Sequence, residues 1–174
     1  MVEALVVPVL AQPVELHTRR CVLRLWKDSD LAPWCEMNAD ADVRRYFPSV
    51  CTEAQARGEA QRCRDAFAQR GWGLWALEVP GVFPFAGFVG LMVPHFDAPW
   101  LPAVEIGWRL MRSAWGQGLA TEAAQAALGF GRHFTLALRG VEPLPAPPRA
   151  DLEIREATEG DLPGVFELLA EQRR

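Results

Sequence analysis

A turn rich in small residues carries the clearest chemical pattern in the sequence. It lies within residues 104–127, where a strand-like segment leads to Gly116, Gly118 and Ala120 and then to an Ala-rich helical segment. Small residues let the backbone approach a ligand closely, and a helix N-terminus presents unpaired N–H groups and a positive dipole end. The pattern therefore indicates either a site for a pyrophosphate, to which Arg112 would add a cation, or a simple reversal of the chain.

Other sites that the sequence could have encoded are not predicted. The turn has no Gly-Lys-Ser/Thr, as a Walker loop would, and no Gly-x-Gly-x-x-Gly dinucleotide motif. The four cysteines form no Cys-x-x-Cys pair and have no histidine at zinc-ligand spacing. We therefore expect no metal site, and reduced, mostly packed thiols.

An α+β arrangement is expected to position the turn. The order strand, helix, helix, strand, strand, strand, helix predicts an α/β/α fold, with a mixed, mostly antiparallel central sheet and helices on both faces. The expected strands cover 14–26, 73–79, 85–93 and 103–111, and the main helices cover 52–70 and 118–133. A further helix begins near Leu31, and 43–47 forms a helical turn.

Composition sets limits on the class of protein. The chain has 174 residues, of which 50% are hydrophobic and 23% charged, and its net charge is −4. These values predict a folded core and exclude disorder of the whole chain. No apolar run is long enough to span a membrane, the start lacks a signal-peptide pattern, and the acidic balance argues against nucleic-acid binding. We expect a cytoplasmic protein.

Five short segments give the chain a specific family resemblance. The turn resembles motif A of the GNAT N-acetyltransferase superfamily, in which a Q/R-x-x-G-x-G/A loop binds the acetyl-CoA pyrophosphate; here a tryptophan, Trp115, stands in the first slot. The segments occur in the family's order and resemble the branch that includes the ribosomal-protein N-terminal acetyltransferases. They are TRRCVLRLW (18–26), WGLW (72–75), GFVGL (87–91), EIGWR (105–109) and WGQGLATEA (115–123).

The resemblance implies that acetyl-CoA is the co-substrate. The backbone of residues 110–112 would lie beside the acetyl-pantetheine arm, and residues 116–121 would hold the pyrophosphate. The cofactor-binding residues implied in this way are Leu110, Met111, Arg112, Trp115, Gly116, Gln117, Gly118, Leu119, Ala120 and Thr121.

Acyl transfer from a thioester to an amine also needs an oxyanion donor, a proton acceptor for the amine and an acid for the thiolate. A backbone N–H near Leu110 is the implied oxyanion donor. Glu105 is the candidate catalytic carboxylate, or else a surface or sheet-bridging residue. The family's usual tyrosine acid is unmatched, because the only tyrosine is Tyr46, far upstream. Three tryptophans either line an acceptor pocket or belong to the core: Trp72, Trp75 and Trp108.

The C-terminal part departs from the family pattern. Residues 14–141 resemble a GNAT domain that is incomplete at its end, 142–150 form a Pro-rich linker, and 151–174 resemble the first strand and helix of a second GNAT domain. The family's fifth strand is missing, which would leave an open sheet edge. We expect 134–141, the strand 151–155, or a second chain in a homodimer to cover it.

Two main functions follow from this pattern. The first is an acetyl-CoA-dependent N-acetyltransferase that modifies a primary amine, either a protein N-terminus or a small molecule. The alternative is a non-catalytic CoA-binding or dimerisation module derived from a truncated tandem acetyltransferase. A weaker third possibility is a module that binds another phosphate-bearing ligand at the same helix terminus.

Overall fold

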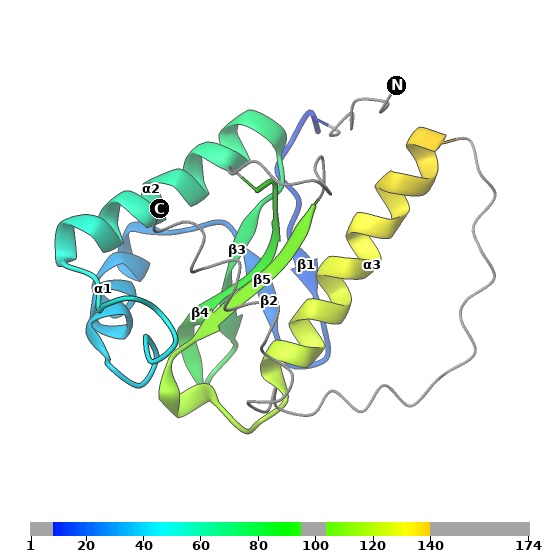
Figure 1. Cartoon of the computed structure of the whole chain (residues 1–174). Coiled ribbons are helices and arrows are strands. Elements are labelled where there is room, and N and C mark those ends of the chain that lie inside the picture. The colour runs from blue at the N-terminus through cyan, green and yellow to red at the C-terminus, as the bar shows by residue number, and fades with distance from the viewer. Residues whose placement is uncertain (1–8, 95–103, 140–174) are drawn as a thin grey trace. The chain divides into compact units, whose positions relative to one another are not determined.

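A computed structural model describes residues 9–94 and 104–139, all of which lie in one compact unit. Two strands are followed by two helices, three further strands and a last helix, as Figure 1 shows. The strands are β1 (Leu16–His17), β2 (Val22–Arg24), β3 (Leu74–Val79), β4 (Phe83–Met92) and β5 (Glu105–Leu110). The helices are α1 (Leu31–Ala39), α2 (Glu53–Arg70) and α3 (Leu119–Arg139), with short 3-10 turns η1 (Asp28–Asp30) and η2 (Arg112–Ala114).

The strands form a meander in the order β1-β2-β3-β4-β5, and each neighbouring pair is antiparallel. The central pairs hold a register in which Trp75 lies opposite Val89, and Val89 lies opposite Trp108. Within the described residues, β5 pairs with β4 on one side and with no strand on the other. The predicted α+β class and mostly antiparallel sheet are confirmed, and β5 is an open edge of the described sheet.

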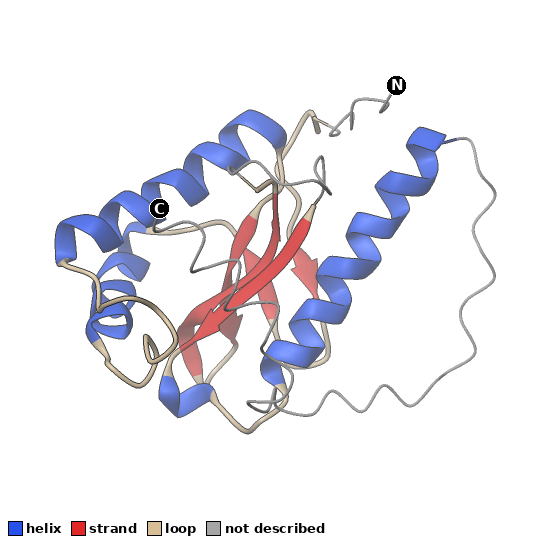
Figure 2. Cartoon of the chain, in the orientation of Figure 1, coloured by secondary structure: helices blue, strands red, loops and turns tan. Residues whose placement is uncertain are grey.

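Helices cover both faces of the sheet, as Figure 2 shows, with α1 and α2 on one face and α3 on the other. The alternation of side chains along β3 explains this, because Trp75 and Leu77 pack into the core beneath α3, whereas Leu74 and Ala76 pack beneath α1 and α2. Trp75 is fully buried, and its ring contacts Phe67 edge-on. The two cores clamp the sheet from both sides and fix the position of β5.

The predicted helix at 52–70 is confirmed by its N-terminal capping. Thr52 and Gln55 form a capping box, in which the Thr52 hydroxyl accepts from the Gln55 N–H at 3.3 Å and the Gln55 side chain accepts from the Thr52 N–H at 2.9 Å. The helix ends at Gly71. This local chemistry made the boundaries of α2 readable from the sequence.

Two expected elements are different in the structure. The single strand expected over 14–26 is split into β1 and β2 by a turn, in which Thr18 bonds to Cys21 through both its main chain and its side chain. The possible strand at 134–141 is wrong for residues 134–139, which continue α3. The segment contains Leu, Ala and Arg and no Gly or Pro before Gly140, so its helix propensity carries the helix beyond residue 133. The predicted linker 142–150 and the strand and helix of 151–174 lie outside the described residues.

Candidate functional site

The turn between β5 and α3 is held in shape by two side chains that bond back to the main chain. The indole Nε1 of Trp115 donates to the Leu110 carbonyl at 2.8 Å, and the Gln117 amide donates to the Ser113 carbonyl at 2.8 Å. Both bonds span only a few residues. They brace the loop against the end of β5 and leave its outer rim to the main chain.

Main-chain N–H groups form that rim. Gly116 and Gly118 adopt left-handed φ angles of 69° and 71°, and a Cβ built on Gly116 would meet nothing within 4 Å. The first helical bond runs from the Glu122 N–H to the Gly118 carbonyl at 3.1 Å. In the described part of the chain, the N–H groups of residues 116–121 have no hydrogen-bond partner. Open space, positive φ and a helix N-terminus together give a cradle that fits an anion.

A carboxylate on the first turn of α3 anchors this cradle to the β1–β2 turn. Glu122 Oε1 accepts from the Thr18 hydroxyl at 2.7 Å and the Arg20 N–H at 2.8 Å, and its Oε2 accepts from Arg20 Nε at 2.7 Å. Arg20 Nη1 also donates to the Gln117 carbonyl at 2.8 Å. The hydrogen bond from Thr18, followed by those from Arg20, lowers the pKa of Glu122 to about 2 against the opposing effect of burial.

The open edge of β5 presents further N–H groups beside the cradle. Met111 donates its N–H to the Ala86 carbonyl at 3.0 Å, in the same register that places Leu110 opposite Gly87. Bonded residues alternate along an antiparallel strand, so the N–H groups of Leu110 and Trp108 face away from β4. The Leu110 N–H is thus available for the oxyanion role that the family resemblance implies, and that role stays a prediction.

The structure brings most of the predicted cofactor residues together. Leu110 and Leu119 have buried side chains that anchor the two ends of the turn in the core. Met111 packs against both hydrophobic cores, and Ala120 and Thr121 lie in the first turn of α3. These side chains position the main chain, which supplies the groups that face outward.

The two charged residues of the predicted site, Arg112 and Glu105, both lie outside the row of free N–H groups. Arg112 forms an exposed ion pair with Asp42, so its charge is already shared. Glu105 is exposed at the start of β5, five residues from Leu110 and on the opposite face of the sheet. At about 3.3 Å per residue, it lies about 17 Å along the strand from Leu110. The catalytic role of Glu105 stays a prediction.

The tryptophans divide between core and surface. Trp72 and Trp75 are buried in the core beneath α3, so they are packing residues and do not line an acceptor pocket. Trp108 lies on the open edge strand with 52% of its surface exposed. Trp108 is the one of the three that is placed to meet a ligand.

A second polar cluster, which the sequence did not reveal, lies on the α1 and α2 face of β5. Arg109 Nη1 donates to Asn38 Oδ1 at 2.5 Å and to Glu59 Oε2 at 3.1 Å. Burial lowers the pKa of Arg109, and the ion pair with Glu59 opposes that effect. Three aromatic rings surround the guanidinium: Trp34, Phe47 and Phe88. The cluster joins residues 50 and 71 positions apart, so no local motif could have indicated it.

Residues 9–94 and 104–139 contain neither a candidate metal cluster nor a candidate membrane span. No group of three or more His, Cys, Asp and Glu side chains there could hold a metal ion, and none of the helices there is long and apolar enough to cross a membrane. The four cysteines, all within this part, are unpaired. Burial raises the pKa of Cys63 to about 12, which makes it unreactive.

Comparisons with known proteins agree with this geometry. The uncharacterized protein YkkB of Bacillus subtilis (strain 168) is 30% identical over 118 residues, which are 67% of this chain and 67% of that protein. A GNAT-family acetyltransferase from Bacillus anthracis matches the fold with a TM-score of 0.55 and 24% identity, over 70% of this chain and 68% of that one. An acetyltransferase from Agrobacterium tumefaciens C58 matches with a TM-score of 0.58 and 20% identity, over 73% and 71% of the two chains.

A structure with bound coenzyme A is also similar. RimL, a ribosomal L7/L12 alpha-N-protein acetyltransferase in complex with coenzyme A, matches with a TM-score of 0.50 and 18% identity, over 68% of each chain. At these identities the solved structures show the fold alone. The family model for the acetyltransferase (GNAT) domain matches residues 20–144, which include strands β2 to β5, the turn and α3. The chain therefore belongs to the GNAT acetyltransferases.

Proposed function

We propose that this protein transfers the acetyl group of acetyl-CoA to a primary amine. The family uses acetyl-CoA, and its members act on amine acceptors. The observation that carries the proposal is the row of unpartnered N–H groups over residues 116–121, at the N-terminus of α3 and beside the open edge of β5. A helix terminus of this kind suits the diphosphate of coenzyme A.

The residues of the turn fit the diphosphate through their main chain. Residues 116–121 would donate N–H groups, and Gly116 and Gly118 keep the approach clear of side chains. Residues 110–112 would lie beside the pantetheine arm, with Leu110 offering the N–H that faces away from β4. Acetyl-CoA supplies a thioester, which is an activated acyl donor. The chain's own task is to position this donor and to stabilise the charge that develops on its carbonyl.

The amine must be neutral when it attacks, so a proton acceptor is needed. Glu105 is the carboxylate that the family resemblance offers; because it lies about 17 Å along the strand from Leu110, it would have to act through a chain of water molecules. Under this assignment, Glu105→Gln lowers kcat about 100-fold at neutral pH while the affinity for CoA is unchanged. Steady-state kinetics with CoA titration would check this. An unchanged kcat would remove Glu105 from the mechanism and leave it as a surface carboxylate.

The acceptor is either a protein N-terminus or a small-molecule amine. RimL, whose name gives a ribosomal protein as its substrate, shares the fold with this chain, and that likeness does not separate the two classes. The unpaired edge of β5 suits a homodimer in which a second copy continues the sheet. We place the reaction in the cytoplasm, where acetyl-CoA and reduced thiols coexist.

A non-catalytic CoA-binding or dimerisation module is the second candidate, and the position of Glu105 favours it. The only tyrosine, Tyr46, lies in the segment between α1 and α2 and is 64% exposed. Packing therefore does not hold it in place as the acid that protonates the departing thiolate. A module of this kind would keep the cradle and lose turnover.

One pair of assays separates these candidates. The full chain is incubated with acetyl-CoA and a panel of primary amines while thiol release is followed, and its thermal stability is measured with and without CoA. Amine-dependent thiol release supports the acetyltransferase. Stabilisation by CoA without thiol release supports the binding module, and absence of both contradicts the use of the cradle for CoA.

A further inference from the structure

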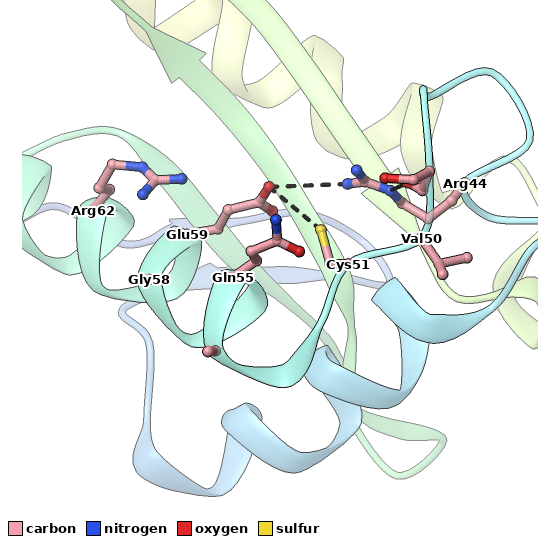
Figure 3. A pocket seen from close by; sticks show the side chains of 9 residues that line it. Arg44, Val50, Cys51, Gln55, Gly58, Glu59 and Arg62 are labelled. Atoms are coloured by element: carbon pink, nitrogen blue, oxygen red, sulfur yellow. Dashed lines mark hydrogen bonds and ion pairs between the residues drawn. The ribbon is translucent and has the colours of Figure 1, made fainter.

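A polar cavity of 360 Å³ opens on the α1 and α2 face of the molecule. Figure 3 shows that the segment after α1 and residues 54–62 of α2 line it. Arg44 and Cys51 come from the segment, and Gln55, Glu59 and Arg62 come from the helix. The volume is at the lower end of the range for small-ligand sites.

Arg44 is the notable residue of this cavity. Its side chain is only 9% exposed, and its guanidinium stacks 4.2 Å above the Phe47 ring while Nε donates to the Ser49 carbonyl at 3.0 Å. Nη1 is buried and has no hydrogen-bond partner among the described residues; the nearest carboxylate oxygen, on Glu59, is 3.9 Å away. A buried charged donor without a hydrogen bond is costly, so a ligand acceptor would stabilise it.

Charge in and beside the cavity is unbalanced. Glu59 faces two buried arginines, because it also pairs with Arg109 at 3.1 Å, and the Nε of Arg109 is likewise buried without a hydrogen bond. Arg62 adds an exposed cation at the rim. One carboxylate therefore serves three guanidinium groups. The guanidinium groups outnumber the carboxylate by two, so the cavity favours an anionic ligand.

The cavity also lies beside the part of β5 that we assign to the donor. Arg109 directly precedes Leu110, and its side chain reaches Glu59 on the cavity wall. The ion pair between Arg112 and Asp42 joins the residues that follow β5 to the segment between α1 and α2, which also lines the cavity. A group bound in the cavity and an acetyl group beside Leu110 would therefore be neighbours.

We propose that this cavity binds a carboxylate carried by the amine acceptor, with the Arg44 guanidinium as its main donor. A guanidinium matches a carboxylate geometrically and holds it through paired N–H bonds. The proposal rests on the proposed acetyl transfer, since it assigns the bound group to the acceptor. It restricts the substrate class to amines with a nearby carboxylate, either free amino acids or peptides with an acidic residue near the N-terminus.

Binding is tested first, without catalysis. Glutarate and its neutral isostere glutaramide are titrated into the full chain while the arginine Nε–H signals of Arg44 and Arg109 are followed by NMR. Glutarate is expected to give saturable shifts and glutaramide none. Arg44→Gln should weaken glutarate binding about tenfold, read at Arg109, because a charge-assisted hydrogen bond is lost. Arg44→Lys keeps the charge but loses the paired N–H groups of the guanidinium, so its affinity for glutarate should lie between those of the wild type and Arg44→Gln.

Arg45→Gln is the matched control, because the neighbouring arginine loses the same charge but does not line the cavity. It should bind glutarate like the wild type. No saturable glutarate shift, or equal binding by folded Arg44→Gln and Arg44→Lys, would overturn the proposal whether or not the protein is an acetyltransferase.

Acetylation then tests whether the carboxylate belongs to the acceptor. Glutamate is compared with glutamine, and a peptide that begins Ser-Asp with one that begins Ser-Asn, which separates the free amino acid from the peptide source. The carboxylate member of a pair should have a kcat/KM about tenfold higher, and Arg44→Gln should remove that preference. Acetylation without preference overturns the acceptor assignment and leaves the acetyltransferase intact. If no amine is acetylated, the proposed function fails, while the glutarate titration still decides on the cavity.

Discussion

The guanidinium of Arg24 on β2 is fully bonded, whereas Arg109 on β5 and the neighbouring Arg44 each keep a buried nitrogen without a hydrogen bond. Arg24 is 5% exposed on its side chain and donates to Glu78, to both oxygens of Asp30 and to the carbonyls of Leu25 and Pro84. These bonds use all five N–H groups of a guanidinium. Both regions lie on the sheet face covered by α1 and α2, so burial alone does not explain the difference.

The contrast separates structural donors from donors that await a ligand. A saturated buried cluster has nothing left to offer and can only hold the fold together. Near β5, Arg44 and Arg109 each keep a buried nitrogen without a partner, and the main chain over 116–121 does the same on the α3 side. Donors without a hydrogen bond therefore lie on both sides of the edge strand that carries the proposed site, while Arg64 and Arg70 keep further ones on α2.

The largest effect is expected when the saturated cluster is broken. Arg24→Met leaves the Asp30 carboxylate, which is 2% exposed, without its main partner. The free energy of unfolding should fall by about 3–5 kcal/mol, since an uncompensated buried charge remains. Urea denaturation would measure it.

Lys27→Met is the control for that variant. The Lys27 side chain is 59% exposed, and its Nζ makes only a long ion pair with Glu78 Oε2, at 3.4 Å. Its effect should stay within about 0.5 kcal/mol. If Arg24→Met lowers the free energy of unfolding by less than about 1 kcal/mol, a fully hydrogen-bonded guanidinium does not by itself indicate a structural role.

The next effect concerns the donors of the turn. Gly118→Val places a β-branched side chain at a φ of 71°, at the rim of the cradle, and should weaken CoA binding roughly 100-fold, or about 2.7 kcal/mol. Gly81→Val is the matched control, because Gly81 has a φ of 75° with nothing within 4 Å of an added Cβ, in the turn between β3 and β4. Calorimetric titration should show normal affinity for the control. Equal losses in both variants would point to general strain.

A smaller effect is expected at the anchor of the cradle. Glu122 is ionised in the folded protein down to a pKa of about 2, below its value of 4.5 when unperturbed, so it stabilises the fold above about pH 4.5 and this contribution is lost as the pH falls towards 2. Glu122→Gln should cost about 1–2 kcal/mol at pH 7 through weaker bonds to Thr18 and Arg20. Urea denaturation at several pH values should show the difference shrinking below pH 4.5. A difference that does not depend on pH would contradict the ionised anchor.

The cradle could be predicted from the sequence because its determinants are local. The small residues at 116, 118 and 120, the start of α3 and the bond from Trp115 to Leu110 all lie within a few positions of one another. The antiparallel sheet was equally readable, since a short Pro-Gly turn joins β3 to β4 and five of the six residues of β3 are apolar. Hydrogen bonds and periodicity over short distances decide these features.

The second cluster could not be predicted because it depends on packing between distant segments. Arg109 meets Glu59 and Asn38 only after α1 and α2 have docked on the sheet. The bonds from Thr18 and Arg20 to Glu122 likewise join residues more than 100 positions apart. The extension of α3 through residue 139 was missed for a different reason, because apolar residues in 134–141 fit a short strand as well as a helix.

The central claim is that the N–H groups of residues 116–121 bind the diphosphate of coenzyme A. Two-dimensional ¹H–¹⁵N NMR of the full chain during a CoA titration measures those groups one by one. The account predicts saturable downfield shifts of the amide protons from Gly116 to Thr121, with the amide of Gly81 unmoved. Saturable binding that shifts amides elsewhere and leaves those of residues 116–121 in place would contradict it.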